Sequence, residues 1–400
     1  MKKTICELFA GVGGFRLGLE KASKDWETVW FSQWEPGKTK QWAHDCYVQH
    51  WGEIDENTGI DIAEVDKTLI PDHNLLVGGF PCQDYSVARP LNGSSGLEGK
   101  KGVLWWQIRD TLQAKQTPFV LLENVDRLLK SPASQRGRDF GVMLACLADL
   151  GYSVEWRVVN AAEYGGAQRR RRVFIFAYKN DTKYGVKMHN AEAFNVLRFD
   201  GFFAKAFPIE PIDVRIDTTV MDYSDIPAIS EKFKFDFCNA GYMVDGKVFT
   251  TTVNPIVEAP VTLGDILETY VPEKYSITGE KLEKWQYLKG AKKIERTSKS
   301  GHTYTFSEGP IAFPDYLDKP ARTMLTSEGT TNRSTHVVLD PQSGNYRILT
   351  PVETERIQGF EDNWTAIMPE RMRYFCMGNA LVVPMVTRMG KVLNKIFEAE

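Results

Sequence analysis

Short apolar runs alternate with amphipathic segments through the first 180 residues of this 400-residue chain. Such runs are typical of buried strands, and segments with apolar residues three and four positions apart are typical of helices. We expect strands at residues 4–9, 28–34, 75–78, 119–122 and 173–178, and helices at 15–22 and 142–150. Strands separated by helices predict an α/β fold, with a largely parallel, doubly wound sheet covered by helices on both faces.

The pattern changes from about residue 190, where prolines recur and helical periodicity becomes patchy. This texture predicts a second, smaller domain of short strands and loops. Near the C-terminus, Thr350 and Glu353 form a predicted capping box, and residues 382–397 form a helix able to pack against the first domain. We therefore expect a first domain of residues 1–190 completed by 366–400, and a second domain of residues 191–365.

Overall composition is that of an ordinary globular protein, with 42% hydrophobic and 25% charged residues. The net charge of −3 excludes a uniformly basic surface, so any affinity for nucleic acid must come from local positive charge. Two segments supply it: four consecutive arginines at 169–172, and residues 281–299, where seven Lys and Arg against two Glu leave +5. A solvated helix face is an equally good interpretation of the second segment.

Six scattered cysteines without a C-x-x-C pair predict a reducing environment and no structural zinc site. No apolar run approaches the length of about 18 residues that a membrane span needs. We expect a soluble, cytoplasmic protein.

A glycine-rich turn directly follows the first predicted strand and includes Phe9, Gly11, Gly13 and Gly14. Glycines in such a turn let the backbone approach a nucleotide-like ligand at the carboxyl edge of a parallel sheet. Glu35 follows the next strand, where an acid suits the two hydroxyls of a ribose. The alternative is a tight turn with a surface glutamate, and the turn alone does not identify the ligand.

Cys82 lies in a second loop that follows an apolar strand. Pro81 fixes the approach of the chain, and the polar neighbours Gln83 and Ser86 favour an exposed loop. A thiolate in this position is a candidate nucleophile, although most single cysteines are buried apolar residues. The glycine- and serine-rich residues 92–102 are a candidate lid.

Glu123 ends the strand at 119–122, and desolvation at the end of a sheet strand favours the protonated form of an acid. It is a candidate general acid, with a loop or helix-capping acid as the alternative. Alternation along the strand that follows the arginines predicts Arg170 and Arg172 on one face, able to grip phosphate or a carbonyl. A solvated basic patch is the alternative for these arginines.

These segments, in this order, resemble the DNA cytosine-5 methyltransferases of bacterial and phage restriction-modification systems. The resemblance covers most of the chain and rests on F-x-G-x-G-G at residue 9, P-C-Q at 81, E-N-V at 123, Q-x-R-x-R at 168, R-I-L-T-P at 347 and G-N at 378. It implies a Rossmann-like S-adenosylmethionine-dependent methyltransferase fold, with the smaller domain recognising the target.

For catalysis, the resemblance implies that Cys82 adds to C6 of cytosine while Glu123 holds and protonates N3. Arg172 would contact the base carbonyl, and Arg170 and Gln168 would shape the pocket and its phosphate contacts. The methyl group would pass from S-adenosyl-L-methionine to C5 of the base.

For the cofactor, the resemblance assigns the methionine end to Phe9, Gly11, Gly13 and Gly14, and the ribose to Glu35. Asp61 would hold the adenine amine and Leu104 would line the pocket, which Asn379 and Ala380 would close. Two positions depart from the family pattern: Pro36 replaces the usual bulky hydrophobe, and Ala380 replaces the usual Ser. Both weaken individual cofactor contacts.

Double-stranded DNA is the implied substrate, with the target base flipped out and residues 83–102 closing over it. Residues 191–340 would carry base recognition, with candidates in 281–299, His302, Tyr304 and 326–333. The implied DNA contacts are Gln83, Ser86, Arg170, Lys292, Lys293 and Arg333.

Three other functions fit the sequence less well. The tRNA-methylating branch of the family typically carries C-F-T signatures that are absent here, and a silent DNA-binding regulator fits poorly with intact Cys82, Glu123 and Arg172. A nicotinamide oxidoreductase explains only the glycine turn. We expect a monomer, with a cognate restriction endonuclease as a functional partner.

Overall fold

The computed structural model describes residues 1–80, 104–211, 215–298 and 301–400. Cys82, Gln83, Ser86 and the predicted lid lie outside the described residues. The chain forms two compact units. The sheet unit comprises Met1–Tyr164, Arg171–Glu258 and Val383–Glu400, and the small unit comprises Gly165–Arg170 and Ala259–Val382.

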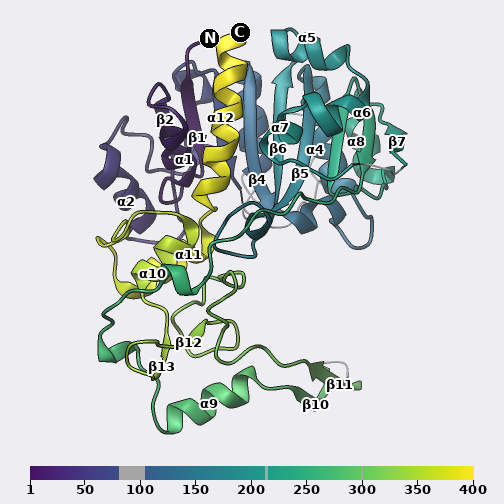
Figure 1. Ribbon diagram of the computed structural model, residues 1–400. Helices are drawn as coiled ribbons and strands as arrows, with labels where there is room; N and C mark the ends of the chain where they lie inside the picture. The colour runs from purple at the N-terminus through teal and green to yellow at the C-terminus, as the bar shows by residue number, and fades with distance from the viewer. Residues whose placement is uncertain (81–103, 212–214, 299–300) are drawn as a thin grey trace. The chain divides into compact units, whose positions relative to one another are not determined.

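Nine strands within the described ranges of the sheet unit form one mixed sheet, in the order β2-β1-β3-β4-β6-β5-β8-β9-β7 (Figure 1). Strands β2, β1, β3 and β4 run parallel, whereas each later strand runs antiparallel to its neighbours. The strands are β1 Thr4–Leu8, β2 Glu27–Ser32, β3 Leu75–Gly79, β4 Phe119–Val125, β5 Tyr152–Asn160, β6 Arg171–Lys179, β7 Asp217–Val220, β8 Ala240–Val244 and β9 Lys247–Thr251.

Helices connect these strands and cover the sheet. They are α1 Gly14–Ala22, α2 Trp42–Trp51, α3 Leu104–Lys115, α4 Arg138–Asp149, α5 Lys183–His189, α6 Ala193–Asn195, α7 Phe202–Ala206, α8 Ile226–Lys232 and α12 Val383–Ala399. Across the described residues of both units, no helix has the length and apolar character needed to cross a membrane.

Both faces of the central strands are buried, which explains their continuous apolar runs. On one face, Val120 and Leu122 join an apolar cluster that includes residues of α3, α4 and α8. On the other face, the ring of Phe119 has its centroid 5.1 Å from that of Phe397 in α12. The predicted doubly wound α/β fold is therefore confirmed.

Helices α1 and α12 pack closely because glycines occupy the contact. A Cβ atom at Gly18 would lie 2.5 Å from Cβ of Val386, and one at Gly390 would lie 2.7 Å from Cβ of Ala22. The C-terminal helix consequently belongs to the sheet unit, as its apolar periodicity predicted.

The sheet is less parallel than predicted, and the units do not divide at the predicted boundaries of residues 190 and 365. Residues 217–251 were expected in the second domain, but β7, β8 and β9 extend the main sheet through the pairing of β8 with β5. Asp245 and Gly246 join β8 to β9 with φ angles of 49° and 72°. An Asp-Gly pair with both residues in this conformation is a strong hairpin signal that the sequence contained.

The small unit contains short elements. They are α9 Glu280–Lys289, β10 Lys292–Thr297, β11 Thr303–Glu308, β12 Val337–Leu339, β13 Tyr346–Ile348, α10 Pro351–Gln358 and α11 Glu370–Asn379. Strand β10 pairs with β11 and β12 pairs with β13, both antiparallel. Ile277, Trp285 and Val337 form an apolar cluster between these elements.

The predicted capping box begins α10 and also anchors a buried ion pair. The Thr350 hydroxyl accepts from the Glu353 amide, and Oε2 of Glu353 accepts from the Thr350 amide. The same carboxylate takes two hydrogen bonds of 2.8 Å from the Arg347 guanidinium, and both side chains are almost fully buried. The helix start and the β13 strand are thus held by one carboxylate.

Substitution Glu353→Gln should remove the nearer of the two carboxylates that pair with the buried Arg347 charge, since Asp340 lies 3.6 Å from its Nε. We expect it to lower the free energy of unfolding by about 3 kcal/mol, measured by urea denaturation. Asp362→Asn is the matched control, because the Arg356–Asp362 pair is partly exposed and its loss should cost about 1 kcal/mol or less. Equal losses from the two substitutions would contradict this account.

Candidate active site

The carboxyl ends of the parallel strands and the start of β6 meet at one edge of the sheet. The chain leaves the sheet at this edge after β1, β2 and β3. Strand β6 runs antiparallel to β4, with Val125 opposite Arg172, so the beginning of β6 lies where β4 ends. The register of β3 with β4 places Gly79 opposite Glu123.

Glu123 and Arg172 form an ion pair at this edge, with Nε of Arg172 2.7 Å from Oε1 of Glu123. The two side chains are only 13% and 18% exposed, so solvent screens the pair less than it would a surface pair. A Cβ at position 79 would lie 3.1 Å from Oε2 of Glu123, so Gly79 leaves space beside the carboxylate. The pair presents an acceptor and a donor together, which suits a planar ring with both kinds of polar atom.

Asn124 holds the end of the β3 segment at Phe80. Its side-chain amide donates to the carbonyl oxygen of Phe80 over 2.9 Å, and both residues are buried. Cys82 follows two positions later in the sequence. The amide therefore ties the end of the β3 segment directly to the strand that carries Glu123.

The glycine-rich turn adopts backbone conformations that glycine favours at two positions. Gly11 and Gly13 have φ angles of 57° and 87°, which side chains disfavour. A Cβ at Gly13 would lie 2.2 Å from the Trp51 ring, whereas one at Gly11 would meet no atom within 4 Å. Phe9 also has a positive φ, 56°, and Gly14 begins α1. The turn is thus packed against the Trp51 ring at Gly13 and has free space beside it at Gly11.

A buried carboxylate supports the turn and was not predicted. Glu7 lies in β1 with no exposed surface, and its Oε2 accepts a 3.0 Å hydrogen bond from the Tyr47 hydroxyl. Burial raises the pKa of Glu7 from 4.5 to about 7. The Arg16 guanidinium lies over the Trp51 ring and pairs with Glu20. A glutamate inside an apolar strand was the sequence signal for this network.

Glu35 follows β2, as predicted, and one of its oxygens is uncommitted. Oε2 is buried and has no hydrogen-bond partner within the described ranges, and desolvation raises the pKa of this carboxyl. The Gln41 side-chain amide holds the Glu35 backbone, accepting from its N–H at 2.7 Å and donating to its carbonyl at 3.0 Å. The Glu35 backbone is therefore held in place, and within the described part of the chain Oε2 has no hydrogen-bond donor.

Two further cofactor candidates belong to the sheet unit. Asp61 caps the 3-10 turn Ile62–Glu64, and its Oδ1 accepts from the Ala63 amide over 2.9 Å. Leu104 begins α3 and packs, half-buried, against the main apolar cluster. Asn379 and Ala380, at the end of α11, belong to the small unit, and their contact with cofactor stays a prediction.

The alternation predicted for Arg170 and Arg172 is wrong, because β6 begins at Arg171 and Arg170 lies in the small unit. The buried Arg170 guanidinium donates to the carbonyls of Met324 and Gly378 over 3.2 and 3.1 Å. Gln168 is also buried, and its Oε1 accepts from the Met324 amide over 2.8 Å. These contacts hold residues 165–170 within the small unit, so we do not propose Arg170 as a phosphate contact.

The three predicted DNA contacts in the described part of the small unit differ in their surroundings. Arg333 donates to the carbonyls of Leu288, Gly290 and Gly309 and pairs with Glu308. Lys292 is half-buried, with Nζ 3.9 Å from Glu308 and 4.8 Å from the centroid of the Tyr287 ring. Lys293 is exposed. The Arg333 side chain is therefore bonded to groups within the small unit, whereas the Lys293 side chain is accessible to solvent.

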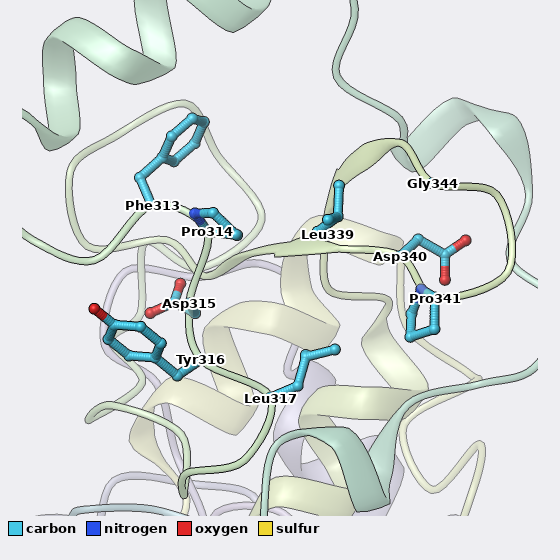
Figure 2. A pocket seen from close by; sticks show the side chains of 9 residues that line it. All are labelled: Phe313, Pro314, Asp315, Tyr316, Leu317, Leu339, Asp340, Pro341 and Gly344. Carbon is cyan, nitrogen blue, oxygen red and sulfur yellow. The ribbon is translucent and has the colours of Figure 1, made fainter.

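Figure 2 shows a pocket of about 520 Å³ in the small unit, between Phe313–Leu317 and Leu339–Gly344. It contains none of the predicted catalytic, cofactor or DNA-contacting residues, so it does not define the active site. Within the described ranges, no three His, Cys, Asp or Glu side chains group as a metal site would require.

Comparisons with known proteins identify the family. The profile of the C-5 cytosine-specific DNA methylases matches residues 3–395, and the chain belongs to this family. It is 52% identical over 399 residues to the Type II methyltransferase M.Sau3AI of Staphylococcus aureus, covering 99% of this chain and 96% of that protein. It is 27% identical to the Type II methyltransferase M.NlaX of Neisseria lactamica, with 99% and 97% covered. The predicted family resemblance is confirmed.

Solved structures support the fold. The crystal structure of a DNMT2 mutant from Spodoptera frugiperda aligns with a TM-score of 0.59 at 13% identity, covering 98% of this chain and 99% of that one. Dnmt2 from S. pombe aligns with a TM-score of 0.58 at 14% identity, covering 99% and 98%. At these identities the likeness concerns the fold alone.

Glu7 should make stability depend on pH. Its pKa is higher in the folded protein than the ordinary value, so the folded state holds the proton more tightly. The resulting stabilisation is present below pH 4.5 and is lost as the pH rises to about 7. We expect Glu7→Gln to lose less stability than the wild type across this interval, measured by urea denaturation at several pH values.

Glu27→Gln is the control for this measurement, because Glu27 is an exposed glutamate on β2. Its stability curve should run parallel to that of the wild type. A Glu7→Gln curve that also runs parallel would remove Glu7 as the source of the pH dependence.

Proposed function

We propose that this protein is a sequence-specific DNA cytosine-5 methyltransferase of the Type II class, acting with S-adenosyl-L-methionine on a cytosine flipped out of duplex DNA. The observation that carries the proposal is the Glu123–Arg172 pair, joined through Asn124 to the segment that leads into Cys82. The similarity to Type II methyltransferases supports DNA as the substrate.

Cytosine needs activation because C5 is a weak nucleophile. In the proposed reaction the Cys82 thiolate forms a bond to C6, and the electron pair of the C5–C6 double bond shifts between C5 and C4 as N3 takes up a proton, which makes C5 nucleophilic. Glu123 holds a proton at N3, and Arg172 donates to the carbonyl oxygen, so both stabilise the developing charge. After the methyl group joins C5, a base removes the C5 proton, and its electron pair reforms the ring double bond as the Cys82–C6 bond breaks.

Residues of the sheet unit fit the proposed cofactor. Glu35 has an uncommitted buried oxygen for the ribose hydroxyls, and the space at Gly11 allows a ligand to approach the turn formed with Phe9, Gly13 and Gly14. Asp61 and Leu104 would meet the adenine end. When bound, S-adenosyl-L-methionine would supply an electrophilic methyl group and would leave as S-adenosyl-L-homocysteine.

Methyl transfer by the purified protein would exclude a silent DNA-binding protein on the same fold. We propose modification of DNA within a restriction-modification system, with a cognate endonuclease as functional partner. The purified protein, incubated with genomic DNA and S-adenosyl-L-methionine, should produce 5-methylcytosine at one sequence motif, detected by bisulfite sequencing. Methylation of tRNA but not of duplex DNA would overturn the proposed substrate.

Three substitutions test the assigned chemistry. Cys82→Ser should lower the methylation rate by roughly 1000-fold or more, because the nucleophile is lost. Glu123→Gln should lower kcat by about 100-fold to 10,000-fold, the usual contribution of a positioned acid. Cys238→Ser, at a half-buried thiol elsewhere in the sheet unit, is the control and should retain activity.

Covalent trapping separates the nucleophile from a structural role. DNA with 5-fluorocytosine at the target cannot lose a proton from C5, so the Cys82–C6 bond should persist. The wild type should form a denaturation-resistant complex with this DNA in the presence of S-adenosyl-L-methionine, and Cys82→Ser should form none. A complex that survives the Cys82→Ser substitution would refute the proposed nucleophile.

A further inference from the structure

Strands β10 and β11 form a separate ribbon in the small unit. Each has six residues, and they pair antiparallel from Lys292 opposite Glu308 to Thr297 opposite Thr303. In the described part of the chain, neither strand joins another sheet. Most of the ribbon's side chains are exposed. A two-stranded ribbon of this kind has little stability alone, so its position depends on contacts at its base.

The base of the ribbon is firmly held. The Arg333 guanidinium binds the carbonyls that flank both strands, at Leu288, Gly290 and Gly309. Nζ of Lys289 donates to the buried Thr335 carbonyl, and burial lowers the pKa of this lysine to about 8. The Ile311 amide also donates to the Lys289 carbonyl over 2.9 Å. These contacts fix where the ribbon leaves the body of the small unit.

The two faces of the ribbon differ, because side chains alternate along each strand. On the first face, Arg296 lies 3.9 Å from the centroid of the Phe306 ring, and Lys292 approaches Glu308 and Tyr287. We call this the packed face. Its cations contact partners inside the small unit, although Arg296 is itself exposed, and the remaining members of this face, Ile294 and Tyr304, are 37% and 43% exposed.

The opposite face, which we call the polar face, carries only hydrogen-bonding side chains, and all are exposed. They are Lys293, Glu295, Thr297, Thr303, Thr305 and Ser307. The one hydrogen bond among them, within the described ranges, joins the Thr297 and Thr303 hydroxyls at 3.5 Å. The face therefore presents donors and acceptors to an external partner.

We propose that the polar face enters the major groove of DNA and reads base edges of the recognition site, an inference that rests on the proposed function. The major groove is about 12 Å wide and admits a two-stranded ribbon, and six residues span about 20 Å of groove. Lys293 is suited to the acceptors of guanine, and Glu295 to the amine of cytosine. Threonine and serine hydroxyls are able to meet either kind of atom.

Charge favours this occupant and this mode of binding. Lys281 and Lys284 of α9 are exposed and are available for phosphates. Glu295, in contrast, would be repelled by phosphates and is favourable only opposite a base-edge donor. The Glu295 carboxylate, with Lys293 and three threonines around it, therefore favours hydrogen bonding to base edges over nonspecific contact with phosphates.

The test uses the full-length protein and compares two faces of one ribbon. The wild-type motif is first defined by bisulfite sequencing of methylated genomic DNA. Then kcat/KM is measured on duplexes with that motif and on duplexes with one base pair changed at each position. Lys293→Ala and Glu295→Gln probe the polar face, and Arg296→Ala, which also removes one exposed cation, is the matched control on the packed face. Thermal unfolding followed by circular dichroism verifies that each variant is folded.

Lys293→Ala and Glu295→Gln should each reduce discrimination at a particular base position by about 10-fold to 100-fold, the range for one lost base contact. Arg296→Ala should retain the wild-type ranking of duplexes. Unchanged discrimination in both polar-face variants, or the same uniform loss in Lys293→Ala and Arg296→Ala, would overturn base reading by this face. If the wild-type protein methylates its motif, the proposed function holds whatever the variants show. If the wild-type protein methylates no DNA, the proposed function is wrong.

Discussion

The ion pair between Glu123 and Arg172 is the interaction on which the rest of the site depends. It exists because β6 enters the sheet antiparallel to β4, which brings the first residues of one strand beside the last residues of the other. A fully parallel sheet would place the start of β6 at the opposite edge. The change of strand direction thus creates a paired acid and guanidinium at the edge where the chain also leaves the sheet after β1, β2 and β3. Asn124 adds the third element by holding Phe80 beside this pair.

The glycine-rich turn shows a second constraint, which acts through packing. Gly13 is required by the nearby Trp51 ring, whereas Gly11 faces open space. The turn therefore has one side fixed by the protein and one side left for a ligand. The ring of Tyr47 lies 3.2 Å from where a Cβ at Gly13 would stand, and the Tyr47 hydroxyl donates to the buried Glu7. The raised pKa of Glu7 therefore links the packing around the turn to the protonation of this carboxyl group.

The small unit uses its cations in two ways. Arg170, Arg333 and Lys289 donate to main-chain carbonyls and hold loops together. Lys293 remains on an exposed strand face with polar neighbours. Net charge or a count of basic residues does not separate these roles, because a buried guanidinium that satisfies carbonyls contributes little to attraction of a phosphate backbone. Accessibility decides which cations are available to DNA.

The local properties of the chain were readable from the sequence. Apolar runs located the parallel strands, the Thr350 and Glu353 pair located the start of α10, and the glycine-rich segment located the turn between β1 and α1. These features depend on residues close together in the chain. The motifs around Phe9, Glu123 and Gln168 indicated the family because each motif consists of residues close together in the chain.

Only the tertiary structure decided which distant groups meet. It assigned Arg170 to the small unit, added β7, β8 and β9 to the main sheet, and buried Glu7 beneath the glycine-rich turn. It also separated Arg333 from Lys293, two basic residues that the sequence treats alike. The physical reason is that burial and pairing are set by packing between segments far apart in the chain, whereas helix starts and turns are set by the backbone preferences of a few neighbouring residues.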